Sequence, residues 1–242
     1  MNNDIEVIAA HADKVLPLGS ARLGGEYYYQ SLPLCIIDAV YSIGVRYEGV
    51  RNVVARYCDH FNLRRTRKTK GAFPPVHEQE SVTSFCEKVE RIGPVAMAAD
   101  VFRNRHRTSA RNGILKADAV HRFALALRRH GIDYLQDIPR FPGSADLAMD
   151  ILSIPGQASG ISLQYFFMLA GSDDVIKPDR MILGFLKSVL GRSVSTAQAQ
   201  ELLSAVAERL RANYPHLTPR LLDHEVWKYQ RDQPGHVTDN QI

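Results

Sequence analysis

Two short stretches within residues 151–190 hold the residues best suited to chemistry. The segment IPGQASGI contains a Pro-Gly turn between apolar stretches, and such a turn can offer backbone N–H groups and a helix N-terminus to a phosphate. Further along, Lys177-Pro178-Asp179 precedes another apolar stretch. Pro178 suits a first helical position, which would put Asp179 in the first turn of a helix. The sequence therefore predicts a phosphate-binding turn followed by a lone carboxylate at a helix start.

Helices must position both features. Apolar residues at helical spacing predict one helix before the turn, a second along ISLQYFFMLA and a third along MILGFLKSVL, which Gly191 closes. The first two helices and their turn would form a hairpin. Other helices are predicted at residues 4–15, 34–42, 50–61, 81–92, 95–102, 114–130, 196–214 and 221–231. Because strand signal is slight and repeats are absent from the sequence, the predicted fold class is all-α.

Four segments in order resemble a known family. IPGQASGI resembles the helix-hairpin-helix of the HhH-GPD superfamily of DNA glycosylases, and KPDRMI falls where that family has its catalytic aspartate. LCIIDAVYSIGVRYEGVRNVVARYC resembles the early helix pair of the family, and GILKADAVHRFALAL resembles the helix before the hairpin. The similarity runs from Leu32 to Leu190. It implies a two-lobed helical fold with a DNA-binding cleft between the lobes. A six-helix lobe with the hairpin would span residues 32–172, and residues 1–31 with 173–242 would form the second lobe.

The resemblance also implies an activity. A monofunctional DNA glycosylase rotates a damaged or modified base out of DNA and hydrolyses its N-glycosidic bond, leaving an abasic site. Asp179 would be the catalytic carboxylate, which stabilises positive charge on the deoxyribose and orients the attacking water. Gly160 occupies the position where bifunctional relatives carry a Schiff-base lysine, and Ala158 replaces the second hairpin glycine. The missing lysine implies that water, and not an amine, attacks the sugar.

Three groups of residues are candidate DNA contacts. In the hairpin and beside the carboxylate these are Pro155, Gly156, Gln157, Ala158, Ser159, Gly160 and Lys177. In the two densest basic runs they are Arg65, Arg67, Lys68, Arg103, Arg105 and Arg107. Arginine and lysine contacts to phosphate give affinity and salt dependence but no sequence preference. The alternative for such runs is a solvated loop with no ligand.

The turn after the early apolar helix is the candidate for entering the DNA beside the rotated nucleotide. Gly44 stands where several relatives have a glutamine, and a glycine cannot fill a vacated base stack. Ile43, Arg46 or Tyr47 would have to fill it, unless the segment is an ordinary helix–helix turn. Asp38, inside the apolar helix, needs a partner if buried: it caps, pairs with an arginine or faces a base pocket, and pairing is favoured.

Composition limits the class of protein. The chain has 242 residues, a formal net charge of +4 and three widely spaced cysteines without a C-x-x-C pair. This pattern predicts a reducing, cytoplasmic location, no disulfide framework, no zinc site and no iron–sulfur cluster. No apolar run has the length of a membrane span. We expect a monomer that binds double-stranded DNA without a cofactor. By resemblance, the hairpin carbonyls can hold a monovalent cation.

Two other functions compete with the glycosylase. A DNA-binding protein of the same fold that has lost turnover fits Gly44, Ala158 and Gly160, whereas the Asp179–Lys177 pair speaks against it. An interaction domain unrelated to DNA would leave both basic runs unexplained. The sequence does not name the base, so both DNA repair and defence against modified phage DNA fit the predicted chemistry.

Overall fold

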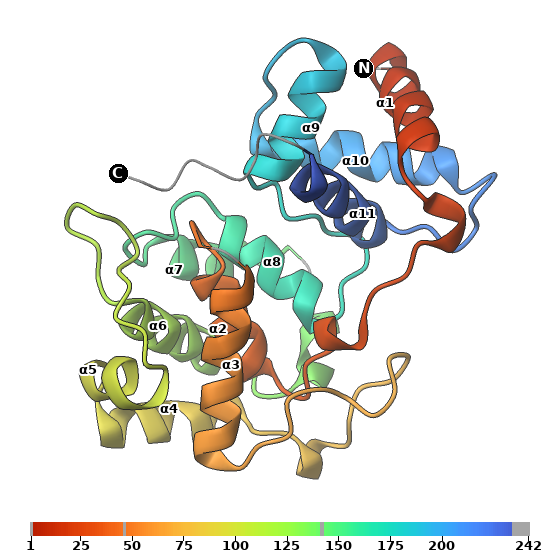
Figure 1. The fold of residues 1–242 in the computed structure, drawn as a ribbon. Helices are drawn as coiled ribbons and strands as arrows, with labels where there is room; N and C mark the ends of the chain where they lie inside the picture. The colour runs from red at the N-terminus through yellow and green to blue at the C-terminus, as the bar shows by residue number, and fades with distance from the viewer. Residues whose placement is uncertain (1, 46, 141–142, 234–242) are drawn as a thin grey trace. The chain divides into compact units, whose positions relative to one another are not determined.

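The computed structural model describes residues 2–45, 47–140 and 143–233, and within them the chain is helical throughout, without a named β-strand (Figure 1). The α-helices are α1 (Asn2–Val15), α2 (Leu32–Tyr41), α3 (Tyr47–Phe61), α4 (Val82–Ile92), α5 (Pro94–Ala96), α6 (Lys116–Arg129), α7 (Ala145–Leu152), α8 (Ile161–Ala170), α9 (Arg180–Leu190), α10 (Thr196–Leu210) and α11 (Pro219–Asp232). The predicted all-α class is confirmed. Among the described helices, none is both long and apolar enough to cross a bilayer.

Side-chain caps start several of these helices, among them α10 at the predicted Ser195 and α11 two residues before the predicted start. Ser195 and Gln198 form a capping box at α10, and Thr218 accepts a hydrogen bond from the amide of Leu221 at α11. The prediction for α10 was too long at its C-terminal end, because the helix stops at Leu210 and a turn follows. Pro215, which cannot continue a helix, comes directly after that turn.

The chain forms two compact units, and the larger one is Gly24–Gly171. Every residue of α2 is buried there, and α2 packs against α3, α6 and α8 (Figure 1). Its sequence LPLCIIDAVY is apolar on all sides except at Asp38. A helix that is apolar all round is expected at the centre of a core. Each fully buried Leu or Ile contributes roughly 1.5–3 kcal/mol relative to exposure, so the burial of α2 stabilises this unit.

Residues 24–31 belong to the larger unit by their contacts, whereas the sequence-based division grouped residues 1–31 with the C-terminal segment. The amide of Gln30 donates to the Arg65 carbonyl at 3.0 Å, and the amide of Arg67 donates to the Tyr28 carbonyl at 2.9 Å. These long-range backbone bonds tie the segment to the loop after α3. No local pattern in the sequence indicates such a pairing.

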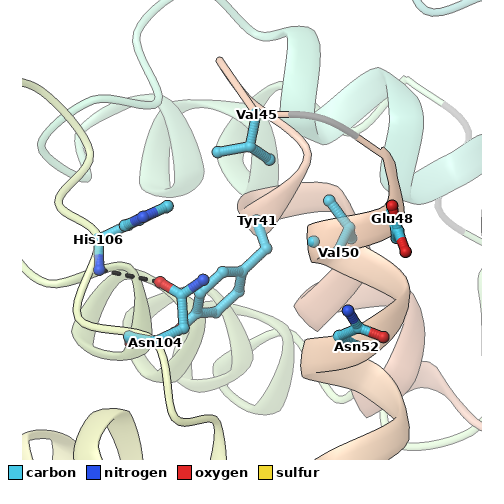
Figure 2. A pocket seen from close by; sticks show the side chains of 8 residues that line it. Tyr41, Val45, Glu48, Val50, Asn52, Asn104 and His106 are labelled. Atoms are coloured by element: carbon cyan, nitrogen blue, oxygen red, sulfur yellow. Dashed lines mark hydrogen bonds between the residues drawn. The ribbon is translucent and has the colours of Figure 1, made fainter.

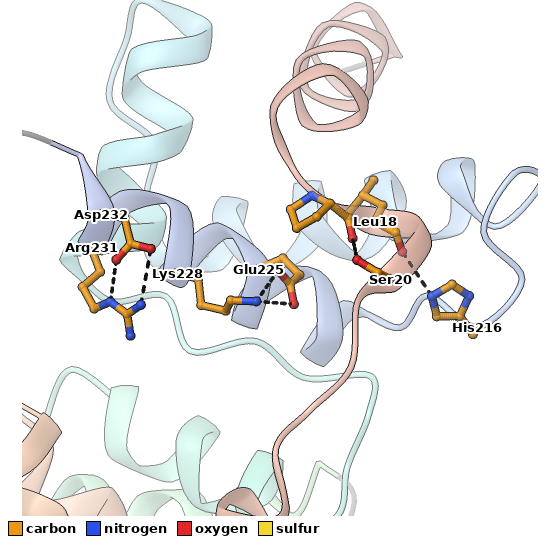
Figure 3. A network of polar contacts seen from close by, with 8 residues as sticks. Leu18, Ser20, His216, Glu225, Lys228, Arg231 and Asp232 are labelled. Atoms are coloured by element: carbon orange, nitrogen blue, oxygen red, sulfur yellow. Dashed lines mark hydrogen bonds and ion pairs between the residues drawn. The ribbon is translucent and has the colours of Figure 1, made fainter.

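The smaller unit is Met1–Leu23 with Ser172–Ile242. Helix α1 packs on α9 and α10, and α11 packs on the same two helices, around a core that includes Ile8, Phe185 and Leu203. Ion pairs link polar side chains of this unit. Figure 3 shows two of them on α11, Lys228–Glu225 at 2.9 Å and Arg231–Asp232 at 2.8 Å. In the same view the Nε2 of His216 donates to the carbonyl of Leu18 at 3.2 Å. Two termini distant in sequence thus share one apolar core.

Candidate functional site

Asp179 is the N-cap of α9, immediately before the first helical residue. Its backbone is extended (φ −81°, ψ −177°), and its Oδ1 accepts hydrogen bonds from the amides of Met181 at 2.8 Å and Ile182 at 3.3 Å. The prediction of a place in the first turn was therefore wrong by one position. The side chain, not Pro178, starts the helix, because a carboxylate satisfies the free amides of a helix start. The residue as a whole is partly buried.

The loop between Gly171 and Asp179 is fixed from α10 by one side chain. Gln200 accepts a hydrogen bond from the Ile176 amide at 2.9 Å and donates to the Asp174 carbonyl at 3.1 Å. One amide group thus satisfies a donor and an acceptor of the loop backbone. This arrangement reduces the freedom of the segment that leads into Asp179.

Helix α11 also holds the loop between Gly171 and Asp179, through two of its residues. The amide of Arg220 donates to the Asp173 carbonyl at 3.0 Å, and its guanidinium lies 3.4 Å from the Asp173 carboxylate. Asp223, one turn later, accepts a hydrogen bond from the amide of Lys177 at 3.0 Å. Lys177 is itself only partly exposed. The backbone amide of Lys177 is therefore used inside the protein, although the sequence suggested only a phosphate contact for this residue.

Asp223 was not predicted as a functional residue. It is 6% exposed, and burial, followed by the nearby charge of Asp179, raises the pKa of its carboxyl well above the usual range of an aspartate. A signal did exist in the sequence, since Asp223 follows Leu222 and precedes Val226 on the apolar face of its helix. A carboxyl on an apolar face needs a partner inside the protein.

Two helices with a turn between them lie at the predicted hairpin, as α7, residues 153–160 and α8. Gly156 has φ +85° and Gly160 has φ +72°, so both occupy the left-handed region, which favours glycine. Within the turn, the amide of Gln157 donates to the carbonyl of Ile154 at 2.9 Å. Among the described residues, the amides of Gly156, Ala158 and Ser159 make no hydrogen bond, and all three residues are exposed. The turn can therefore present three backbone donors to an anion.

The other hairpin residues are arranged differently. Pro155 is exposed beside Gly156 and limits the freedom of the turn. Gln157 is 2% exposed, and its side chain accepts a hydrogen bond from the hydroxyl of Ser162. The side chain of Gln157 thus stabilises the start of α8. Only its backbone remains a candidate for contact with DNA.

The second basic loop lies against the hairpin turn. A Cβ atom placed on Gly156 would lie 2.4 Å from the Cβ of Thr108, which shows how closely the two segments approach. Arg103, Arg105 and Arg107 are exposed on this loop. Arg107 also donates to the carbonyl of Gly113 at 2.6 Å, which closes the loop at its base. The structure therefore brings the hairpin amides and this group of cations onto one region of the larger unit.

The first basic loop is built into the larger unit. The guanidinium of Arg67 donates to the Tyr29 carbonyl at 2.9 Å and lies 4.9 Å from the centre of the Phe73 ring. Lys68 is exposed and lies 4.0 Å from Glu78, and Arg65 is partly buried. In Figure 1 this loop and the loop that carries Arg103–Arg107 lie on opposite sides of the larger unit. The two basic runs therefore do not form one patch.

The turn after α2 is held by a buried lysine. Lys116 is 3% exposed, and its ammonium group donates to the carbonyls of Tyr41 at 3.0 Å and Ile43 at 2.6 Å. Gly44 is exposed with φ +70°, and no atom lies within 4 Å of a Cβ placed on it. Arg46, a candidate wedge residue, lies outside the described residues. The sequence did not indicate the role of Lys116 in fixing this turn.

A pocket of about 320 Å³ opens between this turn and the second basic loop (Figure 2). Its lining residues are Tyr41, Val45, Glu48, Gly49, Val50, Asn52, Asn104 and His106. The side-chain oxygen of Asn104 accepts a hydrogen bond from the backbone amide of His106 at 2.9 Å, which shapes one wall. The lining is mixed, because Glu48, Asn52, Asn104 and His106 are polar whereas Tyr41, Val45 and Val50 are aromatic or apolar.

Asp38 and Tyr47 do not line this pocket but belong to a cluster of tyrosines. Asp38 is fully buried and accepts a hydrogen bond from the Tyr29 hydroxyl at 2.8 Å, so tyrosine takes the place of the arginine favoured from the sequence. The Tyr47 ring stacks on Tyr27 with centroids 5.8 Å apart. Burial, and then the Tyr27 and Asp38 charges, raise the pKa of Tyr47. A stacked, partly buried ring is already engaged, which leaves Ile43 as the described wedge candidate in the turn.

Neither the cysteines nor a metal cluster offers a competing site. Cys35, Cys58 and Cys86 are all buried, and burial raises the pKa of the Cys58 thiol to about 12 and that of Cys86 to about 11. A thiol with a raised pKa is a poor nucleophile because the thiolate is the reactive form. In the part of the chain that the structure describes, no group of three or more His, Cys, Asp and Glu could hold a metal ion.

Comparison with known proteins places the chain in a family. Residues 6–231 match the model of a family described as a domain of unknown function (DUF8548). No curated protein and no solved structure matches the chain. The family match spans both compact units, from α1 to α11, and leaves only short segments at the two ends. Because it covers well over half of the residues, the chain belongs to the DUF8548 family.

Proposed function

We propose that this protein is a monofunctional DNA glycosylase of the HhH-GPD type. It would rotate a damaged or modified base out of double-stranded DNA and hydrolyse the N-glycosidic bond, leaving an abasic site. This activity would serve DNA repair or defence against modified phage DNA. The observation that carries the proposal is the hairpin turn, whose three exposed amides lie beside a loop with three exposed arginines.

The hairpin and the second basic loop supply two kinds of phosphate contact. Backbone amides in a turn form a concave donor set for an anion, and arginine contributes charge and forked hydrogen bonds. Neither kind reads base identity, so this region would hold any duplex. The adjacent pocket of about 320 Å³ has polar groups from Asn104 and His106 and would accept a base displaced from the stack.

Asp179 is the residue we assign to the chemistry. Breaking an N-glycosidic bond builds positive charge on the sugar, and a fixed carboxylate stabilises that charge electrostatically. As an N-cap bonded through one oxygen to two amides, the Asp179 carboxylate is oriented before substrate arrives. Its other oxygen would orient or deprotonate the attacking water.

Two features favour hydrolysis without strand cleavage. Gly160 provides no amine at the position of the Schiff-base lysine, and the α8 sequence ISLQYFFMLA that follows contains no lysine. Lys177 remains the nearest amine to Asp179 in sequence. Its backbone is bonded to the buried Asp223, and we assign its side chain to a phosphate.

The finer fold belongs to the same proposal. We assign the chain to the two-lobed glycosylase fold, with a duplex held in a cleft between lobes, and we expect it to act as a monomer in the cytoplasm. The carbonyls of Ile154 and Gln157 accept hydrogen bonds inside the hairpin turn. Because each carbonyl oxygen has a second lone pair, these two residues would also suit a monovalent cation next to a phosphate.

The decisive experiment measures abasic sites. The purified chain is incubated with duplexes that carry alkylated, oxidised, deaminated and mismatched bases, and with modified phage DNA. The released bases are identified by mass spectrometry. We expect strand breaks only after heat or alkali, and no covalent adduct when borohydride is added during turnover. An adduct that disappears in Lys177→Ala would make Lys177 the nucleophile and refute the monofunctional mechanism.

One observation favours a second function, a DNA-binding protein of the same fold without turnover. Asp179 has a sufficient structural role as the N-cap of α9, worth about 1 kcal/mol, and needs no catalytic role to explain it. This alternative predicts duplex binding with strong salt dependence and no abasic sites with any of the DNAs. If the protein binds no duplex, both functions are wrong.

A further inference from the structure

A buried acid is linked through hydrogen bonds to Asp179, the residue that we assign to the chemistry. Asp223 on α11 accepts a hydrogen bond from the amide of Lys177 at 3.0 Å. The Lys177 carbonyl in turn accepts a hydrogen bond from the amide of Asp179 at 2.7 Å, across Pro178. This is a γ-turn, the tightest backbone turn, and Pro178 limits its freedom further. Two hydrogen bonds in series therefore connect the Asp223 carboxyl to the backbone of Asp179.

The two carboxyl groups also interact through their charges. Burial is the largest cause of the raised pKa of Asp223, and the charge of Asp179 is the second. The hydrogen bond from Lys177 and the charges of Lys177 and Arg220 act in the opposite direction. From α10, the neutral side chain of Gln200 faces the same loop. The protonation of Asp223 is therefore coupled to the charge on Asp179.

A carboxyl is a costly choice for this position if only packing is required. Asp223 is 6% exposed, and an apolar side chain in its place would avoid the desolvation of a charged or polar group. Within α11 its neighbours Leu222 and Val226 are buried and apolar. An acceptor for the Lys177 amide and an ionisable group whose protonation responds to the charge on Asp179 are the two properties that leucine would lack.

We propose that Asp223 is the positioning residue for Asp179, fixing the backbone from which that carboxylate projects and forming an electrostatic pair with it. The effect of Asp223 on base release rests on the proposed function. The hydrogen bonds and the charge interaction between Asp223 and Asp179 do not rest on it. The link between the two residues and its effect on base release can therefore be tested separately. Two substitutions divide the roles: Asp223→Asn keeps an acceptor oxygen and removes the charge, whereas Asp223→Leu removes both.

The first test needs no substrate. Amide hydrogen exchange is measured at Lys177 and Asp179 in the full-length wild-type protein and both variants. We expect exchange at both amides to be at least roughly tenfold faster in Asp223→Leu and close to wild type in Asp223→Asn, because protection follows the hydrogen bond. Equal protection of both amides in all three proteins would overturn the positioning role.

The second test measures the electrostatic pair. The carboxyl of Asp223 is titrated by carbon-13 NMR in the wild type and in Asp179→Asn. Removing a neighbouring negative charge should lower the midpoint of the Asp223 titration by about one pH unit. An unchanged midpoint would refute the pairing. This measurement remains decisive even if Asp223→Leu does not fold.

The third test links Asp223 to base release. Asp223→Leu should lower kcat by about tenfold to a hundredfold with little change in KM, the loss expected when a reacting group is misplaced by a fraction of an ångström to an ångström. Asp223→Asn should restore most of kcat near neutral pH and change the pH profile. The matched control Gln200→Leu loosens the same loop without a change of charge, so kcat should fall while the pH profile keeps its shape.

The outcomes separate the two proposals. If exchange and titration behave as expected and no DNA yields abasic sites, the glycosylase function fails and the positioning role stands. If abasic sites form and Asp223→Leu retains the kcat of the wild type, the positioning role fails and the glycosylase function stands.

Discussion

The smaller and larger units present different kinds of chemical group. In the smaller unit two backbone amides orient the Asp179 carboxylate, and its loop is fixed by Gln200 and by buried groups of α11. The larger unit presents backbone amides of a tight turn and the exposed arginines of the second basic loop. An oriented carboxylate suits chemistry at one atom, whereas amides and cations suit a repeating anionic chain. The difference predicts that catalysis and binding can be removed independently.

The largest effect should follow from Asp179→Asn. Asparagine is as good an N-cap as aspartate, so α9 should keep its start and the protein its stability. Loss of the charge should lower base release by about a hundredfold to a thousandfold, the usual effect of removing one stabilising group. Single-turnover kinetics on the substrate found by mass spectrometry measures this loss.

Duplex affinity of Asp179→Asn should stay at the wild-type level or increase, because the hairpin amides and the second basic loop lie in the other unit and Lys177 is unchanged in this variant. Glu201→Gln, which removes an equal charge from an exposed position of α10, is the control and should leave turnover unchanged. Near-normal turnover in Asp179→Asn would show that Asp179 is not the catalytic carboxylate.

A smaller effect, confined to binding, is expected from the second basic loop. Replacing Arg103, Arg105 and Arg107 by glutamine should weaken binding to all duplexes by at least roughly tenfold. The slope of log K against log salt should become shallower by roughly 0.9 for each phosphate that the variant no longer neutralises. Fluorescence anisotropy at several salt concentrations measures both quantities. A slope equal to that of the wild type would contradict phosphate contact by this loop.

The hairpin turn should show an intermediate loss of both stability and binding. Gly156→Ala forces a Cβ into a left-handed residue and towards Thr108, so we expect a cost above the roughly 1–2 kcal/mol of the backbone strain alone. Gly131→Ala is the matched control, since Gly131 has φ +71° and no atom within 4 Å of a placed Cβ. Urea unfolding and anisotropy compare the two.

Gly131→Ala should lose stability without a change in duplex affinity, whereas Gly156→Ala should lose both. Adding Thr108→Gly to Gly156→Ala should restore part of the stability, because it removes the side chain that the new Cβ meets. Equal losses of affinity in Gly156→Ala and Gly131→Ala would show that the hairpin turn does not contact DNA.

The smallest effect on binding is expected from the first basic loop. Arg67 is engaged with the Tyr29 carbonyl and the Phe73 ring, and Lys68 lies near Glu78. Replacing Arg65, Arg67 and Lys68 by glutamine should change the salt slope less than the substitutions in the second loop do. Thermal stability should fall instead, because Arg67 links two segments of the larger unit. A salt slope that changes as much as for the second loop would remove the distinction between the loops.

Local sequence signals determined the helices and the hairpin. Apolar spacing, a Pro-Gly break and capping residues act over a few neighbouring residues, so they can be read without tertiary contacts. The three helices around the hairpin and Asp179 agree with the structure in kind and nearly in bounds, and Gly191 ends α9 in a left-handed conformation. The one-position error at Asp179 arose because Pro178 and Asp179 are both favourable residues at a helix start.

Only the tertiary structure decided which polar groups are engaged. Both basic runs are rich in arginine and look alike as phosphate contacts in the sequence, but long-range contacts incorporate Arg67 into the larger unit and leave Arg103 and Arg105 exposed. Asp38 meets Tyr29, and Lys116 reaches the turn after α2 across more than seventy residues of chain. Asp223 accepts a hydrogen bond from the amide of Lys177, far from it in sequence. The reason is physical: burying a polar group requires a partner, and the fold decides which partner comes within reach.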